Sequence, residues 1–403
     1  MYDNHFIESK LIPLCALLMG LGVAVSTALM SASYILMVVL VIATGIKDGC
    51  VRKTFQNKYV LTSVLFFCLI IVGISWSNAP ITDRVKMTTR LIEYALVPLL
   101  FIGIQTGRSA SYLIKSFVFG AVLSATLSIF AYTFNYPILQ GRTDTIFYWT
   151  VFRGHLLHDV FLAIASNFIL WRIFERFNQS RNVLILLVII YLICFFDVMF
   201  LVQGRTGEVM LLAMNAVLIL FRFRLKGLVY GGLIVAVILP LLFVFAPAVK
   251  SGVNSYSNDQ VQLEQGNTDT STGLRHQFHH NSWILIKQSP IIGFGTGGFT
   301  NNYSSIVKGT NQIVTNNPHC DWLLIAVQWG GLGILLFVLV LVANIKEILK
   351  LNLKHRALGM SLFTGYLIAT SQNSFFMDNV TGLAYMFLTL SLLSLGSKCN
   401  RGV

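Results

Sequence analysis

The sequence contains few charged residues. Asp, Glu, Lys and Arg together make up 11% of its 403 residues, whereas 55% are hydrophobic. Soluble domains carry roughly 25% charged residues, so this composition excludes an ordinary soluble protein. With a mean hydropathy of +0.72, the chain is predicted to be an all-α polytopic membrane protein.

Several signatures of soluble enzymes are also missing. There is no G-x-x-x-x-G-K-[ST] motif, which argues against an ATP-driven motor. No Asp-x-Asp pair falls in the segments predicted to face outward, so no divalent-metal diphosphate site is expected, and no Ser/His/Asp arrangement with a nucleophile elbow is evident. The six cysteines lie mostly in apolar runs or on the predicted inner side, which argues against a disulfide framework.

Long apolar runs dominate what is present, and runs of about 17–25 residues mark membrane-spanning helices. About twelve are predicted, at residues 11–27, 29–46, 59–77, 91–105, 112–134, 155–174, 183–201, 208–221, 228–246, 320–344, 357–373 and 380–396. One long polar segment, residues 248–320, interrupts the series. The predicted organisation is therefore nine spans in residues 1–247, a loop domain in 248–319 and three spans in 320–403.

Lysine and arginine concentrate in alternate loops. About 19 of the 29 basic residues fall on one side of the predicted bilayer, which the positive-inside rule makes cytoplasmic. Both termini are then cytoplasmic. The net charge of +13 reflects this topology, so no nucleic-acid partner is expected. Without an evident cleavable signal peptide, the pattern suits a multi-pass protein of a bacterial inner membrane, with the polar loop in the periplasm.

The polar loop is predicted to contain short amphipathic helices. Apolar residues recur every three to four positions from Leu274 to Ile286, as on one face of a helix, with Thr272 as its predicted N-cap. Such a helix would lie on the membrane surface and hold Arg275 at the interface. The glycine run 293–298 predicts a tight turn after this helix.

Three residues predicted to face outward are the main candidates for chemistry. Arg205 lies in a short connection with flanking glycines, where a guanidinium can grip a phosphate bidentately; the alternatives are contact with lipid headgroups or pairing with Glu208. Arg275 is either a second anion ligand or a solvated surface arginine. His319, at the start of an apolar helix, is the best candidate for a base, and its alternative is a capping or hydrogen-bonding histidine.

Other basic residues are expected to contribute to the same substrate site: Arg142, Arg153, His155, His158 and Arg90. His155 and His158 lie one helical turn apart, a spacing that can ligate a metal, but no third ligand is apparent. No metal and no cofactor are therefore expected. Two arginines and a histidine suit one task well, because the arginines neutralise a pyrophosphate leaving group and the histidine deprotonates an attacking hydroxyl.

Three ordered motifs carry a resemblance to a known family. They are Gln203-Gly204-Arg205-Thr206-Gly207, the loop segment Arg275…Trp283…Pro290-Ile291-Ile292-Gly293-Phe294-Gly295…Phe299, and Asn317-Pro318-His319-Cys320-Asp321-Trp322-Leu323…Gly330-Gly331-Leu332-Gly333. In order, spacing and topology this set resembles the O-antigen ligase and polymerase superfamily. The resemblance covers the second half of the chain strongly and the first half only by hydropathy.

The resemblance implies a metal-independent, inverting glycosyltransferase of the GT-C type. Its donor would be a glycan on undecaprenyl pyrophosphate, and its acceptor, in the ligases, the lipid A-core sugar. Arg205 and Arg275 match the arginines taken to bind the pyrophosphate, and His319 matches the histidine taken to act in catalysis. The sequence departs from the family at Cys320, where Asn is common, and at Gly204, where Ser is often found.

Within the superfamily three activities compete. They are ligation of O-antigen to lipid A-core, polymerisation of lipid-linked repeats, and transfer of glycan to protein. One large loop of about 70 residues in a chain of modest length favours the ligase. A lipid-linked glycan transporter is the alternative from another class, but its charges would be expected near the midplane of matching halves.

Overall fold

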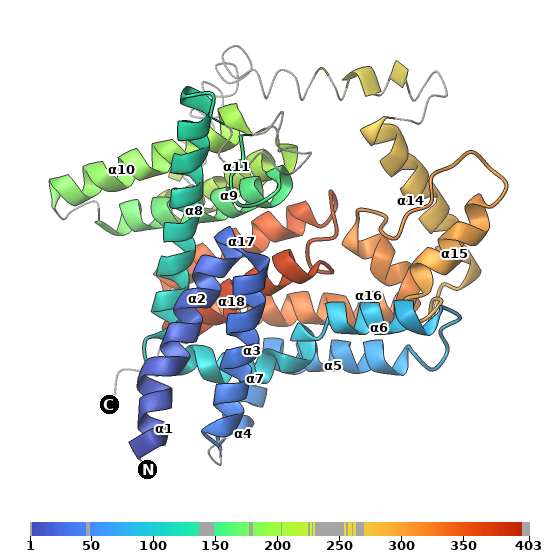
Figure 1. Ribbon diagram of the computed structural model, residues 1–403, viewed down its shortest axis with the longest axis horizontal. Coiled ribbons are helices and arrows are strands. Elements are labelled where there is room, and N and C mark those ends of the chain that lie inside the picture. Colours follow the sequence, from blue (N-terminus) through green and yellow to red (C-terminus); the bar gives the residue numbers. More distant parts are fainter. Residues whose placement is uncertain are drawn as a thin grey trace.

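The chain folds into a bundle of helices (Figure 1). The computed structural model describes residues 2–45, 49–136, 149–176, 180–202, 204–224, 226–227, 229, 254, 257–259, 261–262 and 270–396, and these contain no strand. The elements are α1 (Tyr2–Phe6), the π-helix η1 (Ile7–Leu11), α2 (Ile12–Val25), α3 (Thr27–Ala43), α4 (Cys50–Gln56), α5 (Lys58–Val72), α6 (Ile81–Arg90), α7 (Glu93–Gln105), α8 (Ser109–Thr133), α9 (His155–Arg176), α10 (Arg181–Phe196), the π-helix η3 (Asp197–Leu201), α11 (Arg205–Phe223), α14 (Ser271–Gln288), α15 (Gly298–Val307), α16 (Asp321–Leu349), α17 (Leu353–Ala369) and α18 (Asn379–Gly396).

Eight helical segments among the described residues are long and apolar enough to cross a membrane, which makes the chain a multi-pass membrane protein. They are Asn4–Val25, Ile81–Gln105, Ser109–Thr133, His155–Arg176, Arg181–Leu201, Arg205–Phe223, Asp321–Leu349 and Asn379–Gly396. Each overlaps a predicted span, although Ile81–Gln105 begins ten residues before the predicted span 91–105 because it also contains α6.

Four further predicted spans have other outcomes. The runs at 29–46 and 357–373 form α3 and α17, which are shorter, with 17 residues each. The run at 59–77 forms α5, which meets α4 at a bend of 87°. The run at 228–246 lies almost entirely outside the described residues, so the total of twelve stays a prediction.

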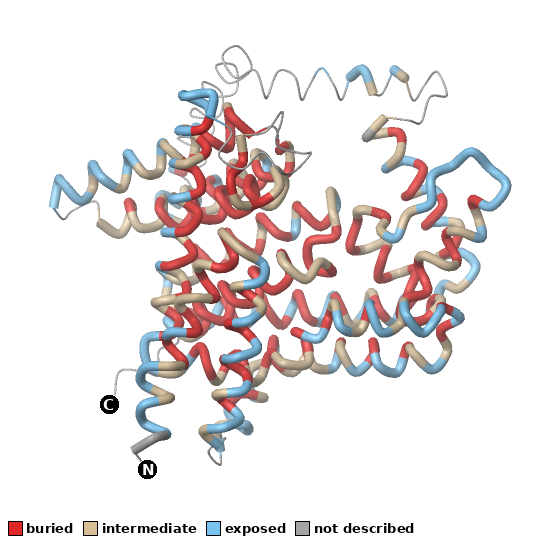
Figure 2. Tube along the Cα trace, in the orientation of Figure 1, coloured by how far each residue is buried: buried red, intermediate tan, exposed pale blue. Residues whose placement is uncertain are grey.

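The helices differ strongly in burial, and this difference locates the core. In the window that defines its span, α18 is 78% buried, whereas the span that contains α10 is 22% buried. Figure 2 shows the same contrast, with α10 mostly exposed or intermediate at one edge of the molecule. Helix α18 is therefore central, and α10 is a peripheral helix whose apolar outer face suits contact with lipid.

The predicted glycine turn is present, and it packs into a break in α16. Gly293 adopts a positive φ of 64°, and Gly330 interrupts α16 with a φ of 60°. On the N-terminal side of this break, Val327 O of α16 accepts from Phe294 N–H of the turn at 2.9 Å. On its C-terminal side, Gly331 N–H of α16 donates to Pro290 O at 2.7 Å. The turn thus satisfies backbone groups that the break leaves without helical partners, as buried non-helical backbone in a membrane protein requires.

The predicted helix around Arg275 is also present, as α14. Its N-cap, however, is Thr270 and not Thr272, because the Thr270 hydroxyl accepts a hydrogen bond from Gly273 N–H at 3.1 Å. Thr272 instead donates its hydroxyl to Asp259 at 2.7 Å. The residues of α14 and α15 lie beside one end of α16 (Figure 1), and their placement in the periplasm stays a prediction.

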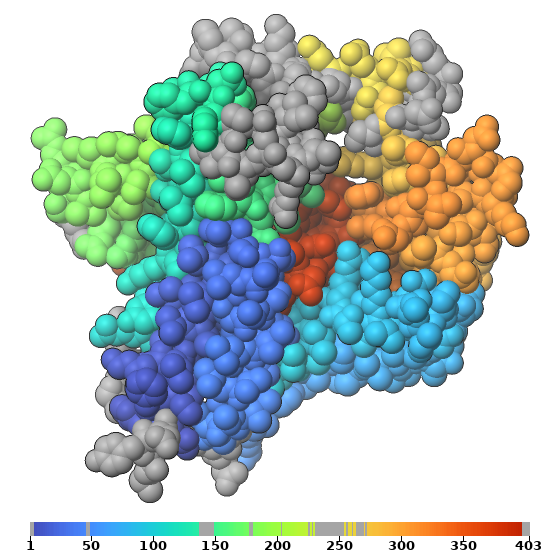
Figure 3. Space-filling model, viewed as in Figure 1, coloured from blue at the N-terminus to red at the C-terminus, as the bar shows by residue number. Residues whose placement is uncertain are grey.

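The late part of the chain reaches the middle of the molecule. Figure 3 shows red residues at the centre of this face, framed by the blue N-terminal helices, the cyan α6 region and the orange α15 region. Residues 370–378, which join α17 to α18 and are here called the 370–378 loop, belong to this late part. The candidate site is built on this loop.

Candidate active site

The His319 side chain is held in one orientation by an amide from the 370–378 loop. Its Nδ1 lies 3.0 Å from Asn373 Oδ1. The same Oδ1 accepts a hydrogen bond from Ser374 N–H at 2.9 Å, which identifies it as the acceptor oxygen and not the amide nitrogen. Nδ1 must therefore carry the proton in this bond. A neutral His319 ring then presents a bare Nε2, which is able to take a proton.

The His319 backbone is equally constrained. Its φ is +56°, an uncommon conformation for a residue other than glycine. Asn317 Oδ1 accepts from His319 N–H at 2.9 Å and from the Ser374 hydroxyl at 2.7 Å. One asparagine thus ties the segment before α16 to the 370–378 loop, and the loop fixes both the backbone and the ring of His319.

The 370–378 loop is itself clamped to the start of α16. The buried Asp321 carboxylate accepts from Phe376 N–H and from Met377 N–H, each at 3.0 Å. Asp321 is also the first residue of α16, and a carboxylate is favourable at a helix N-terminus. Because His319 lies two residues before Asp321, this clamp holds the base candidate close to the loop that orients it.

The first turn of α11 joins the same loop. The Thr206 hydroxyl donates to Gln372 Oε1 at 3.1 Å, and Arg205 precedes Thr206. Only glycine fits at positions 204 and 207, because a Cβ at either position would collide with the carboxylate of the buried Asp159. The glycines predicted to allow close approach therefore admit this carboxylate, and the contact positions the turn that begins with Arg205.

Arg205 and Arg275 lie within electrostatic reach of each other although α11 and α14 are far apart in sequence. Arg275 is exposed to solvent, but desolvation by the protein atoms around it and then the positive charge of Arg205 lower the pKa of its guanidinium. Glu208, in the first turn of α11, lies within electrostatic reach of Arg205, as the alternative pairing from the sequence expects, but no ion pair within 4.0 Å joins them. Two like charges within reach of each other form a site that favours an anion.

One face of α14 brings Arg275 up to His319. Residues 275, 278 and 279 recur at helical spacing on that face, and the Phe278 ring stacks on the His319 ring at 6.0 Å between centroids. Burial, together with the positive charges of Arg275, His276 and His319, lowers the pKa of His279, and a hydrogen bond to the Pro318 carbonyl opposes this shift. The N-terminal half of α14 therefore carries Arg275 within electrostatic reach of Arg205 and Phe278 in contact with His319.

Arg153 and His158 occupy other places. The Arg153 side chain is buried and donates to the Val23 and Gly22 carbonyls and to the Thr27 hydroxyl, at the break between α2 and α3. The buried His158 ring lies 3.1 Å from both Ser124 Oγ and Asp197 Oδ1. Their polar groups are hydrogen-bonded within the protein, and a substrate-binding role for either residue stays a prediction.

The remaining candidates have mixed outcomes. Arg90 ends α6, and its guanidinium lies 3.8 Å from the Asp378 carboxylate, at the end of the 370–378 loop. His155 begins α9 and is half-buried. Arg142 lies outside the described residues. Within the described part of the chain, no three His, Cys, Asp or Glu side chains gather as metal ligands would.

Sequence reasoning missed Asn373. The family pattern suggests an Asn directly after the histidine, and the chain has Cys320 there. In the structure Cys320 is the buried N-cap position of α16, and Asn373, 54 residues after His319, supplies the amide. The one available signal was this departure from the family pattern, which implied that another group must orient the ring.

Together these features define a class. The protein is a multi-pass helical membrane protein with an anion-attracting arginine pair next to a positioned histidine. Residues 190–338 match the family model described as O-antigen ligase, a stretch that includes Arg205, Arg275 and His319. The match confirms, over these residues, the resemblance to the O-antigen ligase and polymerase superfamily. A search of curated proteins gave no match.

Proposed function

We propose that the protein is an O-antigen ligase, which transfers a glycan from undecaprenyl pyrophosphate to the lipid A-core at the periplasmic face of a bacterial inner membrane. The match at residues 190–338 supports the superfamily. The observation that carries the proposed chemistry is the hydrogen bond between His319 and Asn373, because it leaves Nε2 of His319 as a proton acceptor.

The arginines bind the leaving group in this proposal. Arg205 and Arg275 lie within electrostatic reach of each other and repel, and a pyrophosphate bound between them would offset that repulsion. Planar guanidinium groups can each make two hydrogen bonds to phosphate oxygens. They stabilise the negative charge that grows on the pyrophosphate as the glycosidic bond breaks, so no divalent metal is needed in the proposed step.

His319 activates the acceptor. Its Nε2 removes the proton from the acceptor hydroxyl while that oxygen attacks the anomeric carbon and the bond to the pyrophosphate oxygen breaks. The electron pair of the broken bond leaves on undecaprenyl pyrophosphate, and the imidazolium later returns its proton to water. A single direct displacement inverts the anomeric centre, since no glycosyl-enzyme forms.

The ligase assignment within the superfamily rests on the acceptor, so the acceptor is what the experiment varies. Purified protein is incubated with undecaprenyl-pyrophosphate-linked glycan and, in separate reactions, with lipid A-core, with a second lipid-linked repeat, or with an unglycosylated periplasmic protein. We expect transfer to lipid A-core alone. Elongation of the lipid-linked repeat would instead identify a polymerase, and transfer to the protein would identify a protein-glycosylating member.

A further inference from the structure

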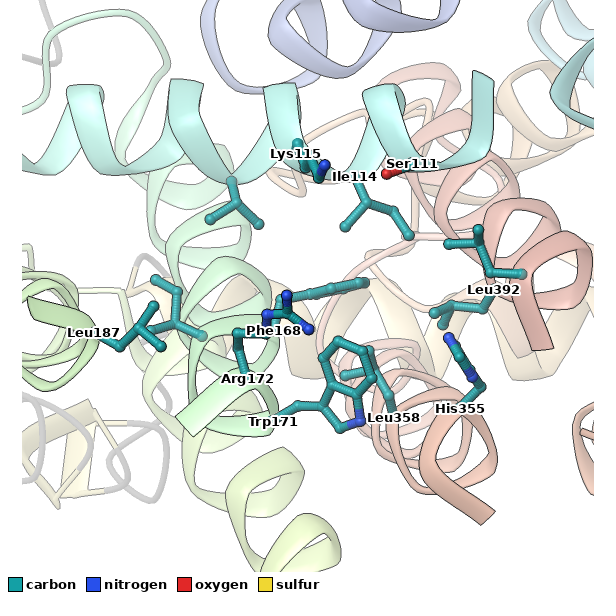
Figure 4. A pocket seen from close by; sticks show the side chains of 13 residues that line it. Ser111, Ile114, Lys115, Phe168, Trp171, Arg172, Leu187, His355, Leu358 and Leu392 are labelled. Carbon is teal, nitrogen blue, oxygen red and sulfur yellow. The ribbon is translucent and has the colours of Figure 1, made fainter. Parts of the chain in front are cut away.

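A second site lies at the other end of α17 from the 370–378 loop. It is a cavity of about 430 Å³ lined by residues of α8, α9, α10, α17 and α18. Figure 4 shows their side chains pointing from several sides into one open space. His355 stands in the first turn of α17, whereas Asn373 follows its last turn. Because α17 has 17 residues, the two sites lie about 25 Å apart along the helix.

The cavity combines cations with apolar walls. Its cations are Lys115 on α8 and Arg172 on α9, and none of the described residues that line it is acidic. His355 on α17 also lines it, but burial lowers the pKa of this histidine from 6.5, so its ring is neutral at pH 7. Most of the other lining residues are aliphatic or aromatic, such as Ile114, Phe168 and Leu187. A set of cations against an apolar wall matches an amphiphile with an anionic head and hydrocarbon chains.

One acidic residue stands just outside the cavity and is already paired. Glu175 lies 2.8 Å from Lys354 Nζ and 3.6 Å from an Arg172 nitrogen. The Lys354 contact is the shorter, so Glu175 is held mainly by a residue that does not line the cavity. The Arg172 side chain remains 43% exposed, which leaves donors for a ligand.

The polar wall of the cavity is preformed. Asn352 Oδ1 accepts from His355 N–H at 3.1 Å and lies 2.9 Å from His355 Nδ1, so Nδ1 donates in that bond. The Trp171 ring packs on the His355 ring at 5.6 Å, and its indole N–H donates to Lys354 O at 3.0 Å. Trp171 and His355 are thus fixed by protein contacts before a ligand arrives, which lowers the entropic cost of binding.

The cavity also borders α10, the peripheral helix whose outer face suits contact with lipid. Leu187 belongs to α10, the peripheral helix, whose exposed residues include Val183, Leu186 and Ile189. The helix ends that meet at the cavity carry many of the basic residues that mark the inner side of the membrane. Acidic phospholipids concentrate their charge at such a surface and attract basic residues near it.

We propose that this cavity binds one acidic phospholipid of that leaflet, with its phosphate against Lys115 and Arg172 and its acyl chains along the apolar side of α8 and α10. The proposal does not depend on the ligase assignment, because none of these residues belongs to the candidate active site. The phosphate chemistry is shared with free phosphate esters, and the acyl chains are what distinguish the lipid.

The test measures lipid binding to the full chain purified in detergent. Native mass spectrometry counts phosphatidylglycerol and phosphatidylcholine retained at matched concentrations, for the wild type and for the double variant Lys115→Gln/Arg172→Gln. Basic residues near the membrane surface contribute about 1 kcal/mol each toward anionic lipid, so loss of two should weaken phosphatidylglycerol binding roughly 30-fold. Phosphatidylcholine should bind weakly to both proteins.

The matched control is Arg52→Gln/Lys53→Gln, which removes two exposed cations of α4 away from the cavity and should retain full binding. The variant Lys115→Arg/Arg172→Lys keeps both charges and should also bind, which separates loss of charge from misfolding. The proposal would be overturned if the wild type retained the two lipids equally, or if the control lost as much phosphatidylglycerol binding as the double variant. It would also be overturned if glycerol phosphate displaced phosphatidylglycerol when present at the same concentration as the lipid.

Discussion

His319 Nδ1 and Asn373 Oδ1 lie 3.0 Å apart, although 54 residues separate them in the chain. Ser374 N–H also donates to that oxygen, so the amide can only accept from the ring. A histidine whose Nδ1–H is engaged in this way is held in the tautomer that leaves Nε2 as the proton acceptor. The proposed base is thus defined by a pair of residues and not by His319 alone.

Asn373→Ala should reduce transfer while leaving donor binding intact. Loss of the acceptor frees the ring to rotate and to change tautomer, and a positioned base contributes about 10²–10⁴-fold, so we expect kcat to fall roughly 10- to 100-fold. Asn373→Asp keeps an oxygen that accepts from Nδ1–H and should restore much of the rate. The measurement is kcat and KM for both variants.

Asn311→Ala is the matched control, because Asn311 is exposed in the segment that leads to His319. It should behave as wild type. If Asn373→Ala raised KM with kcat unchanged, the amide would serve substrate binding, and its role in orienting the base would have to be given up.

Lysine should be a poor substitute for Arg205, although the Arg205→Lys variant keeps the positive charge. An ammonium group cannot reproduce the planar, bidentate contact that a guanidinium makes with phosphate, so we expect at least about a tenfold loss in kcat/KM. Arg222→Lys, at the other end of α11, is the control and should be neutral. Steady-state transfer with both variants at matched protein levels checks this, and full activity of Arg205→Lys would contradict direct recognition of the pyrophosphate.

Much of the fold could be predicted from apolar runs, because a backbone in lipid has few options besides the helix. The sequence-based predictions failed where local backbone geometry, and not the apolar composition of a segment, determines the structure. The N-cap of α14 is Thr270 and not Thr272, since both threonines suit the position and only backbone geometry selects one. The bend of 87° between α4 and α5 had no signal in hydropathy, because it is set locally at Asn57, which caps α5.

The site was predictable only in part. Arg205, Arg275 and His319 stood out because charges beside apolar runs are costly. The same reasoning selected Arg153 and His158, whose side chains hydrogen-bond between helices in the structure. Sequence alone does not distinguish a cation that binds a ligand from one that caps a carbonyl. Asn373 was missed because a neutral amide in a short loop carries no signal until the fold brings it to the ring.

His279 should make the folded protein sensitive to mild acid. Burial and the neighbouring charges of Arg275, His276 and His319 lower its pKa from 6.5. Below that value the unfolded chain takes up a proton that the folded chain resists, so stability is present above pH 6.5 and falls as the pH drops through the lowered pKa. Thermal unfolding in detergent between about pH 7.5 and about pH 5 measures this.

The matched variants are His279→Asn and His280→Asn. Asparagine at position 279 keeps a donor for the Pro318 carbonyl but cannot be protonated, so the decline in acid should become shallower. His280 is exposed, and its replacement should leave the curve unchanged. Parallel curves for wild type and His279→Asn would show that other groups govern the acid sensitivity.

Transfer should continue undiminished in excess chelator. The proposed step balances the pyrophosphate charge with Arg205 and Arg275, so removal of divalent metal takes nothing from it. The assay compares initial rates with and without chelator at constant ionic strength. A rate that collapses in chelator and recovers with magnesium or manganese would require a metal-dependent mechanism.

The most direct test of the account is single-turnover transfer by His319→Gln, with donor binding measured on the same sample. Glutamine can still hydrogen-bond but cannot remove a proton, so we expect normal donor binding, a rate roughly 10²–10⁴-fold below wild type, and inverted anomeric configuration in the wild-type product. Near-normal turnover by His319→Gln, or a product that retains the configuration of the donor, would contradict the role of His319 as the base.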